Sequence, residues 1–497
     1  MLKRIIALLM TVLMISMCVS CGEKQASTGD KVSIKWVMPG PGKQEDADKV
    51  MKAFNKKLQE YLPGVTLEVE TFPWNEYAQK VLLMQTSGEK LDIVNTAPLD
   101  FGTEVRKGSF QDITQIVNDN CKELKELYVD YMWDYTSIDG KIYAVPSDQG
   151  ICRTYGAYVP KELSDKYWDS EKAQQVFLAN NTMTEECYDV IEEYLAGVKE
   201  SGNMRKGMQE SAQYAFKGYE SFYGDFGVRL DDKKCEVVYL YETPEMKLYI
   251  EKMADWYKKG YIRKDALSSY QESSYIGDEN GYILWLASAH KNAADTASKQ
   301  YGFDIDEADF IKPYVGYNNA NAGGNAIAAS CKNPEIAVKL LNLVNSDKEM
   351  YRLLTYGIEG DHYEKINDDK AKLEYKGGNA SSSDRYGIWG YAVGNTFLGF
   401  ENEIHPEGWY DYLSNLPNNV DVKSNLVGFI PDSSTITSEA AQVSSIRQEY
   451  APALISGVQP DYKAKYDEFM KKLEQAGIDK VKKELQKQVD AFLKSKK

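Results

Sequence analysis

Strand-like and helix-like patterns alternate between residues 31 and 94, and this alternation constrains the fold more than any other feature of the chain. Apolar and polar residues alternate over 32–36, which predicts a half-buried strand that ends at the turn 39–42. The patterns that follow predict a helix, a strand, a helix and a strand, at 50–61, 65–69, 75–88 and 91–94. This order predicts an α/β fold with a parallel sheet, in which ligands bind beyond the carboxyl ends of the strands.

Helical patterns with clear start and stop signals follow in the middle and at the end of the chain. Thr243 is expected to cap a helix in which Pro244 takes the first position and Gly260 ends the pattern. The pair Asn333-Pro334 begins another helix in the same way. Further helical patterns cover 184–199, 461–476 and 478–492. Their apolar stripes predict core packing, and we expect the chain to end in a helical pair.

Size and composition bound the class of protein. The chain has 497 residues, more than one hydrophobic core usually organises, which predicts two or more compact units. Acidic residues outnumber basic ones by 75 to 59, and no basic block precedes the Lys-rich end, which argues against a nucleic-acid partner. Tyrosine is frequent, with 36 residues against 15 phenylalanines. Because tyrosine combines an apolar ring face with a hydrogen-bonding tip, this composition suits polar ligands that have apolar faces.

The amino terminus has the pattern of a secretory signal peptide. Two basic residues precede an apolar run over 5–19, and small residues follow the run. Since the run is shorter than the ~20 residues of a membrane-spanning helix, we expect cleavage and no retained span. Small residues also flank Cys21, and this segment resembles the bacterial lipobox, in which the cysteine is acylated and becomes the first mature residue. We therefore expect a lipoprotein signal peptide at 1–20 and a tether at 21–30.

Cysteine, histidine and acidic residues form no strong metal or redox motif. Cys18 and Cys21 have the Cys-x-x-Cys spacing, but redox pairs of this kind belong near a βα unit. The other cysteines are widely and irregularly spaced, which predicts buried free thiols at Cys121, Cys152, Cys187, Cys235 and Cys331. The three histidines are scattered, and the acids at 304, 306 and 309 lack the glycine and glutamate of a calcium loop. We expect no metal and no cofactor, and we interpret those acids as solvated.

Five runs in the mature chain, taken in order, resemble family 1 extracellular solute-binding proteins. The runs are 74–93, 139–146, 326–337, 356–363 and 389–397. The first begins with Trp74-x-x-Tyr77, and the second reads Asp139-Gly140-Lys141-Ile142-Tyr143-Ala144-Val145-Pro146. The tail from 428 to 490 resembles a domain of unknown function that LipO-like lipoproteins carry. The similarity covers nearly all of the mature chain.

The resemblance implies a two-lobed, periplasmic-binding-protein-like (type II) α/β fold with an interlobe ligand cleft and a helical C-terminal tail. The implied lobes are 31–154 with 322–365 for lobe 1 and 155–321 with 366–497 for lobe 2. The implied crossings between the lobes lie near 153–156, 318–325 and 364–369. Because contacts made by both lobes exist only in the closed form, ligand binding would shift the hinge equilibrium toward closure.

The resemblance also implies a function and its partners. It points to an extracellular, lipid-anchored substrate-binding component of an ABC importer, with a carbohydrate as the ligand and an oligosaccharide as the favoured size. The expected partners are the permease subunits, and the membrane through the lipid anchor only. We expect a monomer. A peptide-binding lipoprotein, and a sensor or adhesin that keeps the fold, are the alternatives from other classes.

Seven residues are candidates for ligand contact. A sugar offers a CH face for stacking and a hydroxyl edge for hydrogen bonds. Three tryptophans beside predicted turns or element ends are the stacking candidates: Trp74, Trp285 and Trp389. Four polar residues in family-like loops are the candidate hydroxyl partners: Asp148, Glu359, His362 and Asn395. Core packing is the structural alternative for the tryptophans, and a cap or turn role is the alternative for the polar residues.

Signatures of enzymes are missing from the sequence. It contains no G-x-S-x-G elbow, no G-x-x-x-x-G-K-[ST] loop and no H-E-x-x-H motif. We therefore expect no catalytic residues. A secreted glycosidase needs only two carboxylates about 5 to 10 Å apart, so it stays as the weakest alternative.

Overall fold

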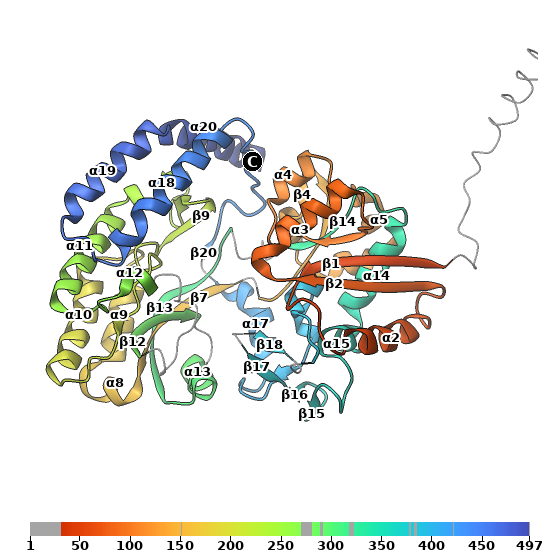
Figure 1. Cartoon of the computed structure of the whole chain (residues 1–497), viewed down its shortest axis with the longest axis horizontal. Coiled ribbons are helices and arrows are strands. Elements are labelled where there is room, and N and C mark those ends of the chain that lie inside the picture. Colours follow the sequence, from red (N-terminus) through yellow and green to blue (C-terminus); the bar gives the residue numbers. More distant parts are fainter. Residues whose placement is uncertain are drawn as a thin grey trace, which may run out of the picture.

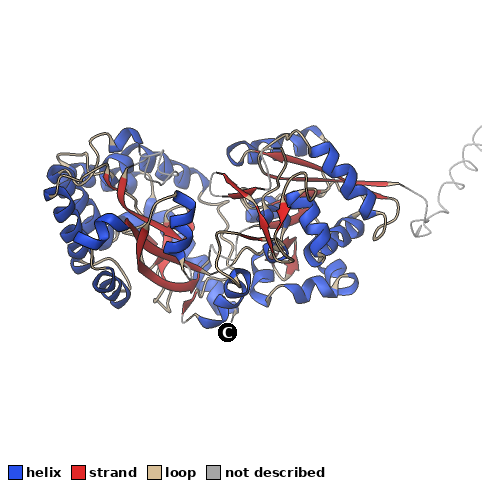
Figure 2. Ribbon diagram, turned by 90° about the horizontal axis from the view of Figure 1, so that it is seen from below, coloured by secondary structure: helices blue, strands red, loops and turns tan. Residues whose placement is uncertain are grey.

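Two five-stranded sheets form the centres of two lobes (Figure 1). The structure is a computed structural model that describes residues 31–150, 152–269, 281–288, 292–317, 323–376, 379–381, 385–420 and 422–496. Helices surround both sheets (Figure 2). The expected two-lobed α/β fold is confirmed.

The sheet of lobe 1 begins with the predicted βαβαβ arrangement. Its elements are β1 (Val32–Pro39), α2 (Ala47–Leu58), β2 (Val65–Phe72), α3 (Trp74–Ser87) and β3 (Ile93–Asn95). β1 lies between β2 and β3 and pairs with both in parallel. In α2, the periodic residues Val50, Phe54 and Leu58 are fully buried, because they form the face that packs on the sheet. The carboxyl ends of the three strands point toward lobe 2 (Figure 1).

One antiparallel strand, a further edge strand and several helices complete lobe 1. β14 (Gly324–Ile327) pairs with β3 and with β6 (Ala144–Pro146). The helices between β3 and β6 are α4 (Phe101–Arg106), α5 (Thr114–Asn120), α6 (Lys122–Leu127) and α7 (Asp130–Tyr135). After β14, α14 (Pro334–Ser346) and α15 (Lys348–Tyr356) follow, and α15 packs against α2. Because β14 enters this sheet after the chain has built much of lobe 2, lobe 1 is discontinuous in sequence.

The sheet of lobe 2 has the order β20-β13-β7-β12-β8. The central strand β7 (Arg153–Pro160) pairs antiparallel with β12 (Tyr282–Ser288) and β13 (Ile305–Val315). The edge strands β8 (Gly207–Met208) and β20 (Val422–Lys423) are short. Described helices of this lobe include α9 (Ser170–Ala179), α10 (Glu185–Glu200), α11 (Pro244–Lys259) and α13 (Ala293–Tyr301). The predicted cap of α11 is confirmed, because Thr243 Oγ1 accepts a hydrogen bond from the Met246 amide at 3.3 Å.

The described residues between 364 and 402 belong to lobe 1, so the expected border at residue 366 and the crossing at 364–369 are wrong. The small sheet of this segment consists of β15 (Glu364–Lys365), β16 (Lys370–Lys372) and β19 (Glu401–Asn402). Arg352 of α15 holds the segment, since its guanidinium lies 3.9 Å from the ring centroid of Phe400. The same guanidinium donates to the carbonyls of Asp368, Leu398 and Gly399. The third crossing follows β19 and reaches β20 through α17 (Trp409–Asn415).

Three helices end the chain and pack on lobe 2: α18 (Thr437–Ile455), α19 (Tyr462–Gln475) and α20 (Ile478–Ser495). α18 and α19 contact α11, and α20 contacts both. The last two helices match the predicted helical pair. The sequence pattern does not predict α18, because its apolar residues follow no helical period and Pro452 lies inside it.

The loop at 430–432 joins the C-terminal helices to lobe 1. Arg106 of α4 donates to the carbonyls of Ile430 and Pro431, at 3.4 and 3.3 Å. On the other side of the loop, the Gln488 side chain of α20 accepts from the Asp432 amide at 2.8 Å and donates to its carbonyl at 2.9 Å. The C-terminal helices therefore contact both lobes, directly or through this loop.

A buried glutamate ties two of the crossings to lobe 2. Glu220 lies on β9 (Tyr219–Tyr223) and is 7 % exposed. Its carboxylate accepts a hydrogen bond from the amide of Tyr317 at 2.7 Å. Tyr317 follows β13, where the second crossing begins. The Glu220 carboxylate also accepts from the hydroxyl of Ser424, which follows β20. Burial raises the pKa of Glu220, so the two hydrogen bonds are needed to stabilise its charged form.

Candidate functional site

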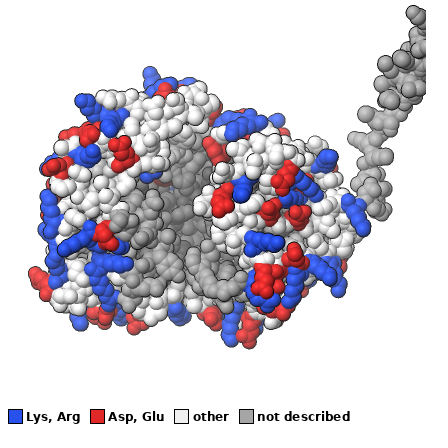
Figure 3. Space-filling model, in the orientation of Figure 1, with Lys and Arg blue, Asp and Glu red and all other residues white. Residues whose placement is uncertain are grey.

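The two lobes lie next to each other along the face that Figure 3 shows. The carboxyl ends of β1, β2 and β3 point toward lobe 2 at this place (Figure 1). Acidic and basic side chains are intermingled on the rest of this face (Figure 3). By the rule for parallel sheets, the strand ends of lobe 1 are where ligand contacts are expected.

Three aromatic rings lie together at these strand ends, and we name them the aromatic platform: Trp74, Trp389 and Tyr391. Trp389 stacks on Tyr391 with ring centroids 5.9 Å apart and an interplanar angle of 25°. Trp74 lies on the other side, 6.4 Å from Tyr391 between centroids, and is 49 % exposed. The structure therefore brings two of the three predicted tryptophans together. Sequence reasoning missed Tyr391, although it lies only two residues after Trp389.

The local sequence explains where each ring of the platform lies. Trp74 is the first residue of α3, and Pro73 ends β2 immediately before it. Trp389 and Tyr391 belong to the start of α16 (Gly390–Val393), a single helical turn that is too short to be stable alone. α16 packs against β1 and β14, so it depends on the sheet for its place.

Two fully buried asparagines fasten α16 to the strand ends. Asn325 of β14 donates through Nδ2 to the carbonyls of Ala392 and Val393, at 3.1 and 3.0 Å. Its Oδ1 accepts from the indole N–H of Trp36 at 2.9 Å. Asn95 of β3 donates to the Ala392 carbonyl at 3.1 Å. These amide groups satisfy the otherwise orphaned carbonyls of a short helix and thereby position Trp389 and Tyr391.

Asp148 and Asn395 lie side by side where the first crossing leaves lobe 1. The Asp148 amide donates to the Gly394 carbonyl at 3.1 Å, and the Thr396 amide donates to the Asp148 carbonyl at 2.8 Å. Each side chain also accepts from a backbone amide two residues ahead, Gly150 at 3.0 Å for Asp148 and Phe397 at 3.2 Å for Asn395. Burial raises the pKa of Asp148. Turn formation is thus an established role for both residues.

Two predicted site residues are buried in the core, which corrects their assignment. Trp285 of β12 is 0 % exposed and packs edge-on against Tyr158 inside lobe 2. His362 is 3 % exposed, and both ring nitrogens have partners: Nδ1 accepts from the Ile358 amide at 3.0 Å, and Nε2 lies 3.1 Å from the Asp46 carboxylate. Both side chains are unavailable to a ligand in this structure because protein atoms cover them.

Glu359 has a different environment. It is exposed in the loop after α15, where it bridges to Tyr363. Within the described chain, no contact joins it to the aromatic platform.

The acids of β13 are less solvated than the sequence suggested. Asp306 and Asp309 are half-buried, as is Glu307 between them, whereas Asp304 is exposed. Glu307 lies over Gly156 of β7, where a Cβ atom would be 2.5 Å from Glu307 Oε1. Burial, with a smaller contribution from Asp309, raises the pKa of Glu307 to about 8.

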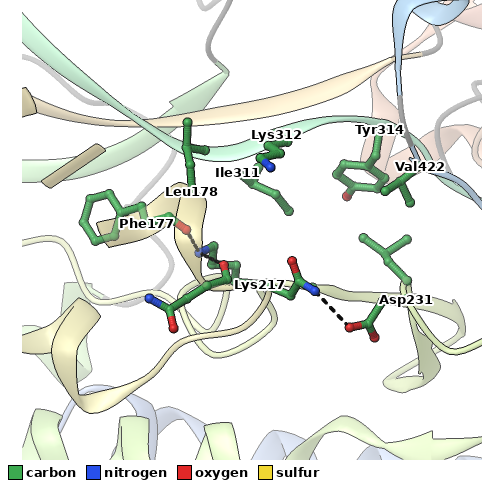
Figure 4. A pocket seen from close by; sticks show the side chains of 12 residues that line it. Phe177, Leu178, Lys217, Asp231, Ile311, Lys312, Tyr314 and Val422 are labelled. Carbon is green, nitrogen blue, oxygen red and sulfur yellow. Dashed lines mark hydrogen bonds between the residues drawn. The ribbon is translucent and has the colours of Figure 1, made fainter. Parts of the chain in front are cut away.

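A cavity of about 100 Å³ lies inside lobe 2, beside β13 (Figure 4). Its buried cation is Lys217, whose Nζ donates to the carbonyls of Phe177 and Asn180 at 2.6 and 2.7 Å. These carbonyls form the C-terminal end of α9. Lys217 therefore caps a helix, which explains its burial without a ligand, and burial lowers its pKa to about 8.

The described residues contain no cluster of three or more potential metal ligands. Their five cysteines are buried and unpaired, as the spacing predicts. Over the same part of the chain, no helix combines the length and apolar character needed to cross a membrane. Cys21 and His290 lie outside the described residues.

Two lobes, each with its own sheet, joined by three crossings, with an aromatic platform at the strand ends of lobe 1, define a two-lobed ligand-binding protein. Residues 49–358 match the family of bacterial extracellular solute-binding proteins, and the chain belongs to this family. Residues 425–494 match a domain of unknown function, DUF3502, which comprises the three C-terminal helices. The family consists of proteins that bind substrates for transport and not of enzymes.

One relative and two crystal structures of another protein match the chain over nearly its whole length. The chain is 26 % identical over 490 residues to a carbohydrate ABC transporter substrate-binding protein of Streptococcus pneumoniae serotype 4, with 96 % of this chain and 94 % of the relative covered. It is similar to the crystal structure of NgtS, an N-glycan transport solute binding protein of Streptococcus pneumoniae, with a TM-score of 0.76, 22 % identity and coverage of 94 % and 100 %. The complex of NgtS with Man5GlcNAc matches with a TM-score of 0.67, 23 % identity and the same coverage.

Replacing the amide that holds α16 should weaken the fold. Asn325→Ala leaves the Trp36 indole N–H and the Val393 carbonyl without partners, so we expect the free energy of unfolding to fall by about 2–3 kcal/mol. Urea unfolding followed by circular dichroism measures this. Asn203→Ala, at an exposed position, should change stability by less than about 0.5 kcal/mol. Equal unfolding midpoints for Asn325→Ala and wild type would contradict the proposed role of the amide.

Stability should depend on pH through Glu307. Because its pKa is raised from 4.5 to about 8, the folded state binds a proton that the unfolded state releases between these values, so its contribution to stability falls as pH rises. At about 1.4 kcal/mol per pKa unit, we expect wild type to lose about 2–4 kcal/mol relative to Glu307→Gln between pH 4.5 and 8.5. Urea unfolding at both pH values tests this, with exposed Glu126→Gln as the control. Parallel pH profiles for wild type and Glu307→Gln would refute it.

Proposed function

We propose that this protein is the extracellular, lipid-anchored substrate-binding component of an ABC importer, and that its ligand is a carbohydrate of oligosaccharide size. The observation that carries the proposal is the aromatic platform at the carboxyl ends of the lobe 1 strands. A pyranose ring has an apolar CH face that stacks on such rings and hydroxyl groups that need polar partners around them. The carbohydrate relative and the N-glycan transport protein NgtS support this ligand class.

Ligand contact is proposed for four of the predicted residues. Trp74 and Trp389 would stack on the sugar, with Tyr391 between them. Asp148 and Asn395 lie where the first crossing leaves lobe 1, and the atoms not used in their turns would accept or donate hydrogen bonds to hydroxyls. Trp285 and His362 are buried in the core and have no part in the proposed site, and no contact within the described chain joins Glu359 to the aromatic platform.

Closure of the lobes is the proposed mechanism. A sugar that lies on the platform of lobe 1 gains further contacts from lobe 2 only when the lobes approach each other. Binding then favours the closed form by the difference in affinity between the two forms. The permease would distinguish loaded from empty protein by this change of shape. We propose a monomer, since each chain contains both halves of the site.

The anchor is proposed from the sequence of the amino terminus. Acylation at Cys21 after removal of residues 1–20 would place two or three acyl chains in the membrane. Each buried methylene contributes ~0.8 kcal/mol, so such an anchor holds the protein at the outer face of the cell membrane. Residues 21–30 would be the tether between the lipid and β1.

A ligand panel tests the proposed function. Thermal unfolding is followed in the presence of Man1GlcNAc, Man5GlcNAc, kestose and short peptides. A ligand that binds the folded state raises the melting temperature, because it adds RT ln(1 + [L]/Kd) to stability. We expect an oligosaccharide to give the shift and to be recovered chemically unchanged. A shift with peptides only, or a hydrolysed sugar, would contradict the proposal.

Removing rings of the platform should weaken sugar binding without unfolding the protein. Stacking of a ring on an aromatic side chain contributes about 0.5–1.5 kcal/mol beyond burial, so Trp74→Ala and Trp389→Ala should each raise Kd by about 2- to 12-fold. Isothermal titration with the sugar found in the panel measures this. Leu83→Ala, an exposed apolar residue on the same helix as Trp74, is the control and should leave Kd unchanged. Unchanged affinity in both tryptophan variants would exclude the platform as the site.

A further inference from the structure

We propose that a groove beside β2 is a second sugar subsite, which takes an uncharged branch or extension of the oligosaccharide held on the aromatic platform. We name it the edge groove. It lies between β2, the start of α2 and the segment at 386–388, and its volume is about 580 Å³. This is within the range of about 300–1,000 Å³ that is usual for small-molecule sites. The inference rests on the proposed carbohydrate function.

The edge groove is continuous with the aromatic platform. Pro73 and Ile388 both line the groove. The next residue in the chain after each is a platform residue, Trp74 and Trp389 respectively. Two separate segments therefore lead from the groove to the platform, so a sugar chain on the platform can extend into the groove without leaving the protein surface.

The outer edge of β2 is partly closed by α2. The Phe72 carbonyl accepts from the Gly40 amide at the end of β1, so even-numbered residues of β2 face β1 and odd-numbered residues face outward. Asn55 of α2 pairs with both backbone groups of Leu67, at 2.6 and 2.8 Å. Gln59 covers the Val65 carbonyl at 2.7 Å. These side chains protect the first half of the strand edge.

Backbone groups of the second half of β2 are open to the edge groove. Val69 and Thr71 line the groove, and no described residue pairs with their outward N–H and C=O groups. Two donors and two acceptors at fixed spacing can bind sugar hydroxyls. Two residues are too few for an added peptide strand, because Asn55 blocks one end and Pro73 the other. The exposed edge therefore favours a sugar over a peptide.

The charged side chains of the edge groove determine whether a charged or an uncharged sugar can bind there. The edge groove carries six charged side chains: Lys35, Lys43, Asp48, Glu68, Glu70 and Glu89. Lys35 is neutralised, since its Nζ lies 2.8 Å from Glu70 and 3.1 Å from Glu89. Four acids against two bases leave an acidic wall, which repels a carboxylated sugar. The branch is thus uncharged, as in mannose or glucose.

The test compares two glycans and a matched pair of variants by isothermal titration. The probes are Man1GlcNAc, which is small enough to occupy the platform alone under the proposal, and Man5GlcNAc, which adds branches. Thr71→Pro removes one outward N–H, and proline is tolerated at such an edge position because no ladder hydrogen bond is lost. Thr71→Val keeps this N–H and removes only the hydroxyl. Asp48→Trp, at an exposed position, fills the groove instead and serves if the proline variant fails to fold.

We expect wild type to bind Man5GlcNAc at least tenfold more tightly than Man1GlcNAc. Thr71→Pro and Asp48→Trp should reduce this advantage five- to tenfold while the Kd for Man1GlcNAc stays within twofold, and Thr71→Val should change neither. If wild type binds both glycans equally, or if Asp48→Trp keeps the whole affinity difference between Man5GlcNAc and Man1GlcNAc, the edge groove is not a sugar subsite. Either result would leave the proposed function unaffected. Failure of wild type to bind either glycan would instead count against the proposed function, and the groove would fall with it.

Discussion

The candidate site depends on hydrogen bonds from two asparagine side chains that are completely buried. Asn95 and Asn325 are at the ends of neighbouring strands, and both hold the carbonyls of α16. A helix of one turn has no stability of its own, so these amides convert a flexible segment into a fixed support for two aromatic rings. The indole of Trp36 holds Asn325 in turn, which connects the platform to the centre of the lobe 1 core. The sheet of lobe 1 therefore keeps Trp389 and Tyr391 in fixed positions.

The hinge has a comparable arrangement, with polar groups that fix where bending occurs. Glu220 fastens the second and third crossings to lobe 2, and Asp148 with Asn395 fastens the start of the first crossing to lobe 1. Tyr135 of lobe 1 adds a buried link to the second crossing, since its hydroxyl donates to the Gly316 carbonyl at 3.0 Å. A motion of the lobes is therefore confined to short segments, while each sheet moves as a rigid unit.

Much of the architecture could be predicted from the sequence, because periodicity and caps are local. The βαβαβ unit, the cap at Thr243 and the last two helices are of this kind. The position of the third crossing could not be predicted from the sequence, because the strands that precede it are too short to give a pattern. β15, β16 and β19 have only two or three residues each, and their segment is held by Arg352 from elsewhere in the chain. For the site, sequence placed Trp74 and Trp389 correctly beside element ends, yet gave Trp285 the same rank. Whether a tryptophan is exposed or lies in the core depends on packing between distant segments, which the sequence pattern does not show. The burial of His362 against Asp46 could not be predicted for the same reason.

The order of segments has a consequence for biogenesis. β20, the loop at 430–432 and Gln488 belong to the last fifth of the chain, yet they complete the edge of the lobe 2 sheet and the bond to α4 in lobe 1. During synthesis and export, the flank of β13 that β20 covers stays unpaired until nearly the whole polypeptide has emerged. An unpaired strand edge is prone to aggregation, so this end of β13 can mispair until β20 has been made.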